Sequence, residues 1–144
     1  MKVFEFWHDH AGLSVPDLRA SIAWYERTLG FVLERTNVVE TIPATIAILH
    51  NGNLRIELFE VPGAEAASAD RSIPNQDLRT HGHKHISFAV ADVLALSQEM
   101  ARRGADIVWV KKFPFGTNMF IRDNSGNLIE FVERPKPLPA VTFL

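Results

Sequence analysis

The sequence predicts an α+β fold made of two tandem βαβββ modules, and an internal repeat carries this prediction. The stretch HAGLSVPDLRASIAWYERTLGF begins at His10, and a shortened form of it, HISFAVADVLALSQEMARRGA, begins at His85. The ends of the two modules also match, because GNLRIE closes on Glu57 and GNLIE closes on Glu130. In each module a histidine opens an alternating apolar strand, an amphipathic helix follows, and the last strand carries a glutamate.

Composition is that of an ordinary soluble globular protein. The 144 residues, of which 47% are apolar and 22% charged, fit one folded domain. We divide this domain into module one (about 8–60), a linker (61–84), module two (about 85–134) and a C-terminal tail (135–144).

Charge and hydropathy argue against several kinds of partner. A net charge of −2 gives no reason to expect nucleic acid or an anionic membrane surface. No apolar run approaches the roughly 20 residues of a membrane span, and the opening MKVFEFWHDH becomes polar too early for a signal peptide. The chain has no cysteine, which excludes disulfides and thiolate chemistry. We therefore expect a cytoplasmic protein.

Module one is expected to contain one helix and several strands, after a lead-in (residues 1–9) that can form an edge strand. Asp17 caps the start of the helix, Gly30 ends it, and Asn51 and Gly52 form a hairpin turn. The expected strands are residues 10–15, 31–39, 45–50 and 54–59. The buried stripe of the helix is predicted to be Leu18, Ile22, Tyr25 and Leu29.

Module two repeats this plan with a shorter helix, which begins at Asp92 and ends at Gly104. That helix is expected to bury three side chains, those of Val93, Leu96 and Met100. The expected strands are residues 85–90, 107–110, 117–122 and 127–132. The 61–84 linker shows no periodicity, and a connection of that length is usually functional or a crossover. The prolines of the C-terminal tail predict an extended chain.

Strand alternation gives both histidines small neighbours. Each imidazole shares its side of the strand with two short side chains, which are Gly12 and Ser14 in module one and Ser87 and Ala89 in module two. A histidine that packs in a core more often lies among bulky residues, so this pattern predicts room for a ligand beside each ring.

The duplicated βαβββ order and its matched polar residues resemble the vicinal oxygen chelate superfamily. That family includes glyoxalase I, methylmalonyl-CoA epimerase, fosfomycin-resistance enzymes, extradiol dioxygenases and bleomycin-resistance proteins. The resemblance covers about residues 8–134. It implies two modules, related by pseudo-twofold symmetry, in a curved, cupped mixed sheet around a cavity. It also implies that the first and fourth strands of each module supply metal ligands, here His10, Glu57, His85 and Glu130.

The donor set agrees with this implication on chemical grounds. Two imidazoles and two carboxylates suit a borderline divalent ion, so the expected cofactor is Zn, Ni, Co, Fe(II) or Mn. Four such groups in a symmetric arrangement are difficult to explain as unpaired buried residues, which cost free energy. His8 lies two residues before His10 and competes for the same role, but the alignment of the repeats favours His10.

The resemblance implies a function of the glyoxalase or epimerase type. Such an enzyme is a metal-dependent lyase or isomerase that moves a proton next to a carbonyl of a small oxygenated substrate, through a metal-chelated enolate. Glu57 and Glu130 are the candidate catalytic residues, because one of them can loosen and act as general base. Ser14 and Val61 stand where glyoxalase I carries the Arg and Asn that serve glutathione, so glutathione is not expected as cosubstrate.

Two alternatives stay open. The first is an Fe(II) or Mn(II) dioxygenase of the same fold, although the single tyrosine of this chain, Tyr25, lies in the helix stripe rather than beside the ligands. The second is a non-catalytic, bleomycin-resistance-type binding protein, which commonly lacks the four ligands. The resemblance also implies a homodimer, to which Phe143 and Leu144 can contribute.

Other polar side chains have simpler interpretations. His81 and His83 lie in the THGHKH segment before the second repeat and are expected in a loop. Lys111, Lys112 and Arg122 can bind an anionic substrate, but solvated charges at a sheet edge are favoured.

Two pairs of aromatic residues complete the candidates. Trp24 and Tyr25 are expected to pack in the first helix. Phe113 and Phe115 flank a proline in a loop, where they either line the mouth of a pocket or simply pack.

Overall fold

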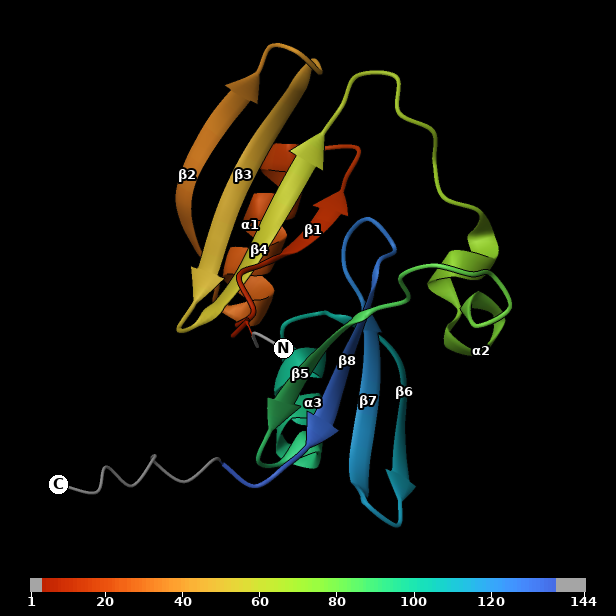
Figure 1. The fold of residues 1–144 in the computed structure, drawn as a ribbon. Coiled ribbons are helices and arrows are strands. Elements are labelled where there is room, and N and C mark those ends of the chain that lie inside the picture. The colour runs from red at the N-terminus through yellow and green to blue at the C-terminus, as the bar shows by residue number, and fades with distance from the viewer. Residues whose placement is uncertain (1–3, 137–144) are drawn as a thin grey trace, which may run out of the picture. The chain divides into compact units, whose positions relative to one another are not determined.

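The computed structural model describes residues 4–136 and contains two compact units, residues 1–68 (unit 1) and 69–144 (unit 2) (Figure 1). Each unit has a four-stranded mixed sheet, with the strand order β1-β4-β3-β2 in unit 1 and β5-β8-β7-β6 in unit 2. One helix packs on each sheet and leaves the other face, the open face, uncovered by a helix of its own unit. The α+β class and the repeated βαβββ order are therefore confirmed.

The first strand of unit 1 runs parallel to the last, and the other strands pair antiparallel. The elements are β1 (Ala11–Ser14), α1 (Leu18–Leu29), β2 (Val32–Val39), β3 (Ala44–Asn51) and β4 (Leu54–Glu60). The lead-in strand predicted for residues 1–9 is wrong where it can be checked, since residues 4–9 form no strand. Phe6 and Trp7 are 91% and 83% exposed, so this segment buries no apolar face against a sheet. Residues 1–3 lie outside the described range.

Unit 2 has the same pairing pattern, with β5 parallel to β8. Its elements are a 3-10 helix, η1 (Ala69–Ser72), then α2 (Pro74–Asp77), β5 (Ile86–Val90), α3 (Val93–Arg102), β6 (Asp106–Phe113), β7 (Gly116–Arg122) and β8 (Leu128–Glu133). The end of the predicted tail, including Phe143 and Leu144, lies outside the described residues. No helix within residues 4–136 has the length and hydropathy of a membrane span.

The second half of the linker is ordered, which its lack of periodicity did not predict. Asp77 is 1% exposed, and its Oδ1 lies 3.0 Å from Arg71 Nε and 3.2 Å from Lys84 Nζ. Arg122 Nε donates to the Ser72 carbonyl at 2.7 Å and so ties the linker to β7. The segment is thus held by a buried carboxylate that pairs with residues on both sides of it, and not by a periodic apolar stripe.

The core of each unit lies between the sheet and its helix. Fully buried side chains include Tyr25, Leu49, Ile56 and Leu58 in unit 1 and Val93, Met119, Ile121 and Ile129 in unit 2. The predicted stripe of α1 is partly wrong, because Ile22 and Leu29 are only half-buried, whereas Ser21 and Thr28 are buried beside Tyr25. In α3, Val93 and Met100 are buried as predicted and Leu96 is half-buried.

Two carboxylates hold the start of each helix, and only one of them was apparent from the sequence. In unit 1 Asp17 Oδ1 accepts from Ala20 N at 2.8 Å, while Glu60 Oε2 accepts from Leu18 N at 2.6 Å. In unit 2 the matching bonds run from Ala95 N to Asp92 and from Val93 N to Glu133. The second carboxylate stands three residues after Glu57 or Glu130, on the helix-covered face, because strand side chains alternate.

We expect the Asp17→Ala variant to lower the free energy of unfolding by about 1 kcal/mol, since one helix-end N–H loses its acceptor. Urea unfolding followed by circular dichroism measures this change. Glu26→Ala, at an exposed position toward the other end of the same helix, is the control. Equal effects of the two variants would contradict the capping role.

Candidate metal centre

The first predicted pair of ligands lies together on the open face of unit 1. His10 immediately precedes β1, and the parallel register places Gly12 opposite Glu57 of β4. This register brings His10 Nε2 to 2.9 Å from Glu57 Oε2. Both side chains keep contact with solvent, with exposed fractions of 38% and 19%. The Phe59 ring occupies part of the space beside this pair. A Cβ atom added at Gly12 would lie only 3.1 Å from that ring, so a larger residue at this position would be crowded.

The other ring nitrogen of His10 is held by its neighbour. His10 Nδ1 lies 2.6 Å from Asp9 Oδ2. This hydrogen bond, opposed in part by burial and supported by the charge of Glu57, raises the pKa of His10. The same bond lowers the pKa of Asp9. A ring that keeps its Nδ1 proton on Asp9 and gives up its Nε2 proton has an Nε2 lone pair free to bind an ion beside Glu57, as in a metal-ligating histidine.

The second pair repeats this geometry in unit 2. His85 precedes β5, and the register places Ser87 opposite Glu130 of β8. His85 Nε2 lies 3.2 Å from Glu130 Oε2. The His85 ring also meets Phe120 edge-on, with ring centroids 5.0 Å apart.

Asn118 of β7 orients Glu130 and was not apparent from the sequence. Its Nδ2 donates to Glu130 Oε1 at 2.9 Å, and the residue is 7% exposed. The corresponding position of unit 1 is Ile46, which has no donor to offer Glu57. The two pairs therefore differ: Glu130 contacts both His85 and Asn118, whereas Glu57 contacts His10.

We expect Asn118→Ile, which copies the unit 1 residue, to weaken Zn²⁺ binding by about 10- to 100-fold, the usual cost of losing an outer hydrogen bond to a ligand. Isothermal titration calorimetry on the full chain measures the affinity. Asn75→Ile, the same change at an exposed position of α2, is the control. Unchanged affinity in Asn118→Ile would show that Glu130 needs no support from β7.

Both pairs fit two neighbouring ligands of a divalent ion. Metal–donor bonds of about 2.1 Å at right angles place the two donor atoms about 3 Å apart. The measured nitrogen–oxygen separations of 2.9 and 3.2 Å agree with that value. Within residues 4–136 no group of three or more acidic or histidine side chains lies close enough together to hold a metal ion. Each His–Glu pair on its own therefore supplies two of the four predicted ligands.

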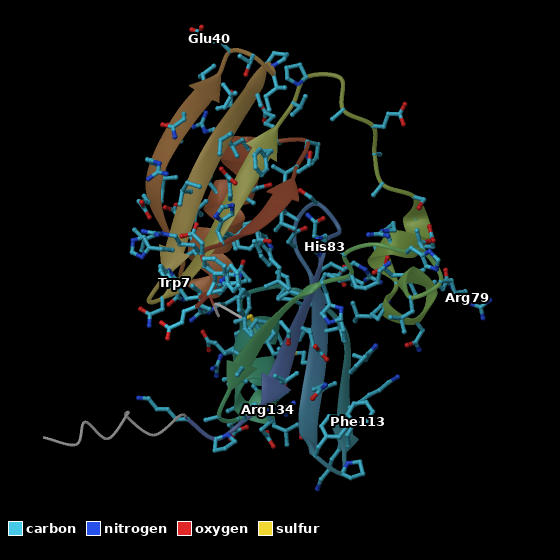
Figure 2. The ribbon with its side chains drawn as sticks, viewed as in Figure 1. Trp7, Glu40, Arg79, His83, Phe113 and Arg134 are labelled. Carbon is cyan, nitrogen blue, oxygen red and sulfur yellow. The ribbon has the colours of Figure 1, made fainter. Side chains whose placement is uncertain are left out.

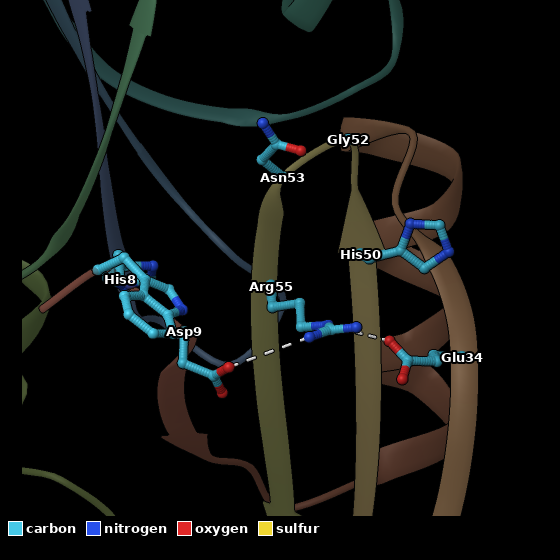
Figure 3. A pocket seen from close by; sticks show the side chains of 8 residues that line it. His8, Asp9, Glu34, His50, Gly52, Asn53 and Arg55 are labelled. Carbon is cyan, nitrogen blue, oxygen red and sulfur yellow. Dashed lines mark hydrogen bonds and ion pairs between the residues drawn. The ribbon is translucent and has the colours of Figure 1, made fainter.

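A polar cavity of about 690 Å³ adjoins the first pair on unit 1 (Figure 3). Arg55 lies at its centre, with Nε 3.1 Å from Glu34 Oε2 and one terminal nitrogen 4.0 Å from Asp9 Oδ1. Asp9 in turn holds His10, so a chain of charges links the cavity to the first pair. The lining residues are Trp7, His8, Asp9, Glu34, His50, Gly52, Asn53 and Arg55.

The other histidines that the sequence offered lie apart from these pairs. His8 lines the cavity, while the Glu57 carboxylate contacts His10. His81 and His83 are exposed and lie in a loop before β5, as expected; Figure 2 shows His83. The His83 carbonyl accepts a hydrogen bond from Arg71 at 2.6 Å, so this residue serves the linker.

The remaining candidates divide between core and surface. Trp24 and Tyr25 pack edge-on in the core with ring centroids 4.9 Å apart, and Tyr25 is fully buried. Arg122 is occupied by Ser72 and Asp106. Lys111, Lys112, Phe113 and Phe115 lie along β6 and the hairpin that follows it.

A match to a family model identifies the superfamily of this chain. A model of the glyoxalase/bleomycin resistance protein/dioxygenase superfamily matches residues 7–131. The chain is a member of this superfamily. The resemblance read from the duplicated histidines and glutamates is thereby confirmed at the level of the family. No curated protein sequence gives a match.

Solved structures of superfamily members share the fold across most of the chain. A glyoxalase family protein from Enterococcus faecalis is 19% identical, with a TM-score of 0.75 over 88% of this chain and 97% of that one. A glyoxylase/bleomycin resistance protein/dioxygenase domain from Frankia is 26% identical, with a TM-score of 0.73 over 92% and 95%. The trypanothione-dependent glyoxalase I of Leishmania major is 22% identical, with a TM-score of 0.68 over 90% and 87%.

Proposed function

We propose that this protein is a metal-dependent lyase or isomerase of the glyoxalase or epimerase type, which moves a proton at the carbon next to a carbonyl. The observation that carries this proposal is the matched geometry of the two His–Glu pairs, each with Nε2 and Oε2 about one ligand separation apart. The proposal requires the pair of unit 1 and the pair of unit 2 to bind the same ion. That ion would be Zn, Ni, Co, Fe(II) or Mn.

When bound, a divalent ion supplies Lewis-acid polarisation of a substrate carbonyl. The residues of this chain hold the ion and move the proton. His10, His85 and Glu130 act as ligands. A carboxylate close to the substrate takes the proton from the carbon next to the carbonyl and returns it to the same or the neighbouring carbon.

Glu57 is the better candidate for that base. Its side chain has the His10 contact, and the matching neighbour on β3, Ile46, donates no hydrogen bond to it. Glu130 has both oxygens engaged, one near His85 and the other on Asn118. A carboxylate with fewer hydrogen bonds changes position at lower cost, so Glu57 moves and Glu130 stays.

The substrate of the proposed enzyme is a small oxygenated acid, thioester or adduct. Ser14 and Val61 offer neither of the two side chains that serve glutathione in glyoxalase I, so glutathione is not proposed as cosubstrate. We expect a cytoplasmic homodimer, which is common for this fold.

Hydrogen exchange tests the reaction. We expect full-length protein loaded with Zn²⁺ or Co²⁺ and kept without oxygen to exchange the hydrogen next to the carbonyl of a 2-oxo acid, a 2-hydroxy ketone or a branched acyl thioester for solvent deuterium. Proton NMR measures the loss of that signal, and protein treated with chelator is the control. Activity that needs both Fe(II) and oxygen, without exchange in any candidate, would instead establish the dioxygenase alternative.

A further inference from the structure

The open face of unit 2 carries a row of aromatic rings that begins at the second pair. Antiparallel pairing places Glu130, Phe120 and Trp109 side by side on β8, β7 and β6. The rings follow one another without interruption: His85 meets Phe120 at 5.0 Å, and Phe120 meets Trp109 at 4.8 Å between centroids. Phe120 is 6% exposed and forms a floor, whereas Trp109 is half-buried and offers part of its ring.

Lys111 places a positive charge above the far end of this row. Its Nζ lies 4.6 Å from the centroid of the Trp109 ring. Among the described residues no carboxylate forms an ion pair with Lys111, and the residue is exposed. A cation–π contact satisfies part of an ammonium group and leaves its N–H donors free for an anion.

The hairpin after β6 extends the apolar surface. Phe113 stacks on Phe115 with ring centroids 5.2 Å apart and planes 4° from parallel, and the Trp109 ring centroid lies 6.4 Å from that of Phe113. Phe115 is 62% exposed, which is unusual for so large an apolar side chain. The open face of unit 1 has no such row: Ile48 and Ile46 stand where unit 2 has Phe120 and Asn118.

We propose that this face is a binding subsite for an aromatic carboxylate, with the ring of the ligand against Trp109 and its carboxylate on Lys111 Nζ. Two strand spacings, about 10 Å, separate the Glu130 strand from the Trp109 strand. With its ring against Trp109, a benzoate that carries a carbonyl group opposite the carboxylate covers part of this distance, and its carbonyl points across Phe120 toward the second pair. The orientation of the carbonyl toward His85 and Glu130 rests on the proposed function, whereas the contacts with Trp109 and Lys111 do not.

The subsite is tested by binding to metal-free, full-length protein, followed by ligand-observed NMR. The probes are 4-acetylbenzoate, its methyl ester, and 4-acetylcyclohexanecarboxylate, which lacks the aromatic ring. We expect 4-acetylbenzoate to bind about tenfold more tightly than either other probe, because a hydrogen-bonded charge and a stacked ring each contribute on that scale. Lys111→Gln should abolish the preference for the acid over the ester, and Trp109→Leu should abolish the preference for the aromatic ring.

Lys112→Gln is the matched control, because Lys112 has the same charge on the same strand but alternates to the opposite face. It should keep the full preference for the acid. Equal affinity for acid and ester in the unchanged protein, or equal losses in the Lys111 and Lys112 variants, would overturn the subsite. If Trp109→Leu fails to fold, the comparison of Lys111→Gln with Lys112→Gln still tests the subsite.

The acetyl group of the same probe keeps this inference separate from the proposed function. Binding without deuterium exchange in the Zn²⁺-loaded protein would leave the subsite intact and remove the proposed reaction. Exchange of the acetyl hydrogens with no preference for acid or ring would support the reaction and remove the subsite.

Discussion

Replacing Glu57 with Gln is expected to slow hydrogen exchange next to the substrate carbonyl by about 10²- to 10⁴-fold, the usual contribution of a general base. The amide keeps the shape of the side chain and an oxygen that can face an ion, but it no longer accepts a proton. Zn²⁺ affinity should therefore fall by less than the exchange rate. Deuterium exchange by NMR at saturating Zn²⁺ measures the rate, and calorimetry measures the affinity.

Two further variants make this result specific. Glu130→Gln should act mainly through weaker Zn²⁺ binding, so that excess metal restores much of the exchange. Glu40→Gln removes an exposed carboxylate from the turn between β2 and β3 and should change neither quantity (Figure 2). If Glu130→Gln at saturating Zn²⁺ is the slower of the two ligand variants, then Glu130 is the base.

His85→Ala is expected to weaken Zn²⁺ binding by more than about 100-fold, because it removes a ligand rather than an outer hydrogen bond. His10→Ala should have a similar effect, since each histidine faces its glutamate at a similar distance. Competition with a chromogenic chelator measures affinities of this strength.

The control for these losses is His83→Ala. His83 stands two residues before His85, is exposed, and contributes its carbonyl rather than its ring to the structure. Its replacement should leave Zn²⁺ affinity within about twofold of the original, because it removes neither a ligand nor an outer hydrogen bond to one. A loss in His83→Ala equal to that in His85→Ala would mean that the variants act through general damage to the segment.

The repeated fold and the two His–Glu pairs were accessible from the sequence because they depend on local patterns. Strand alternation and the duplicated motif predict which residues open and close each module, and the structure places His10 beside Glu57 and His85 beside Glu130. Asp9 was not predicted, although it directly precedes His10, because its role becomes clear only with the 2.6 Å contact.

Other features depend on pairings between distant strands, which alternation alone does not give. Asn118 reaches Glu130 because β7 and β8 pair in one particular register. Glu60 and Glu133 cap helices more than 30 positions earlier in the chain, as Leu18 N and Val93 N show. The linker folds around the buried Asp77, whose partners come from both sides of it in sequence. No periodic pattern marks such contacts.

The difference between the two open faces has a chemical consequence. Unit 1 surrounds its pair with charged groups, among them Asp9, Glu34 and Arg55. Unit 2 surrounds its pair with aromatic rings and the Lys111 ammonium. The open face of unit 1 is therefore mainly charged and that of unit 2 mainly aromatic, although their His–Glu pairs have matching geometry.

If both His–Glu pairs bind one ion, each chain holds a single ion, and metal stoichiometry measures this number. Full-length protein, purified without chelator or immobilised nickel, is dialysed to equilibrium against Zn²⁺, and its metal content is measured by mass spectrometry. We expect one ion per chain, and loss of that ion in both His10→Ala and His85→Ala. Two ions per chain, or one ion that persists when either histidine alone is removed, would show that the pairs bind metal separately.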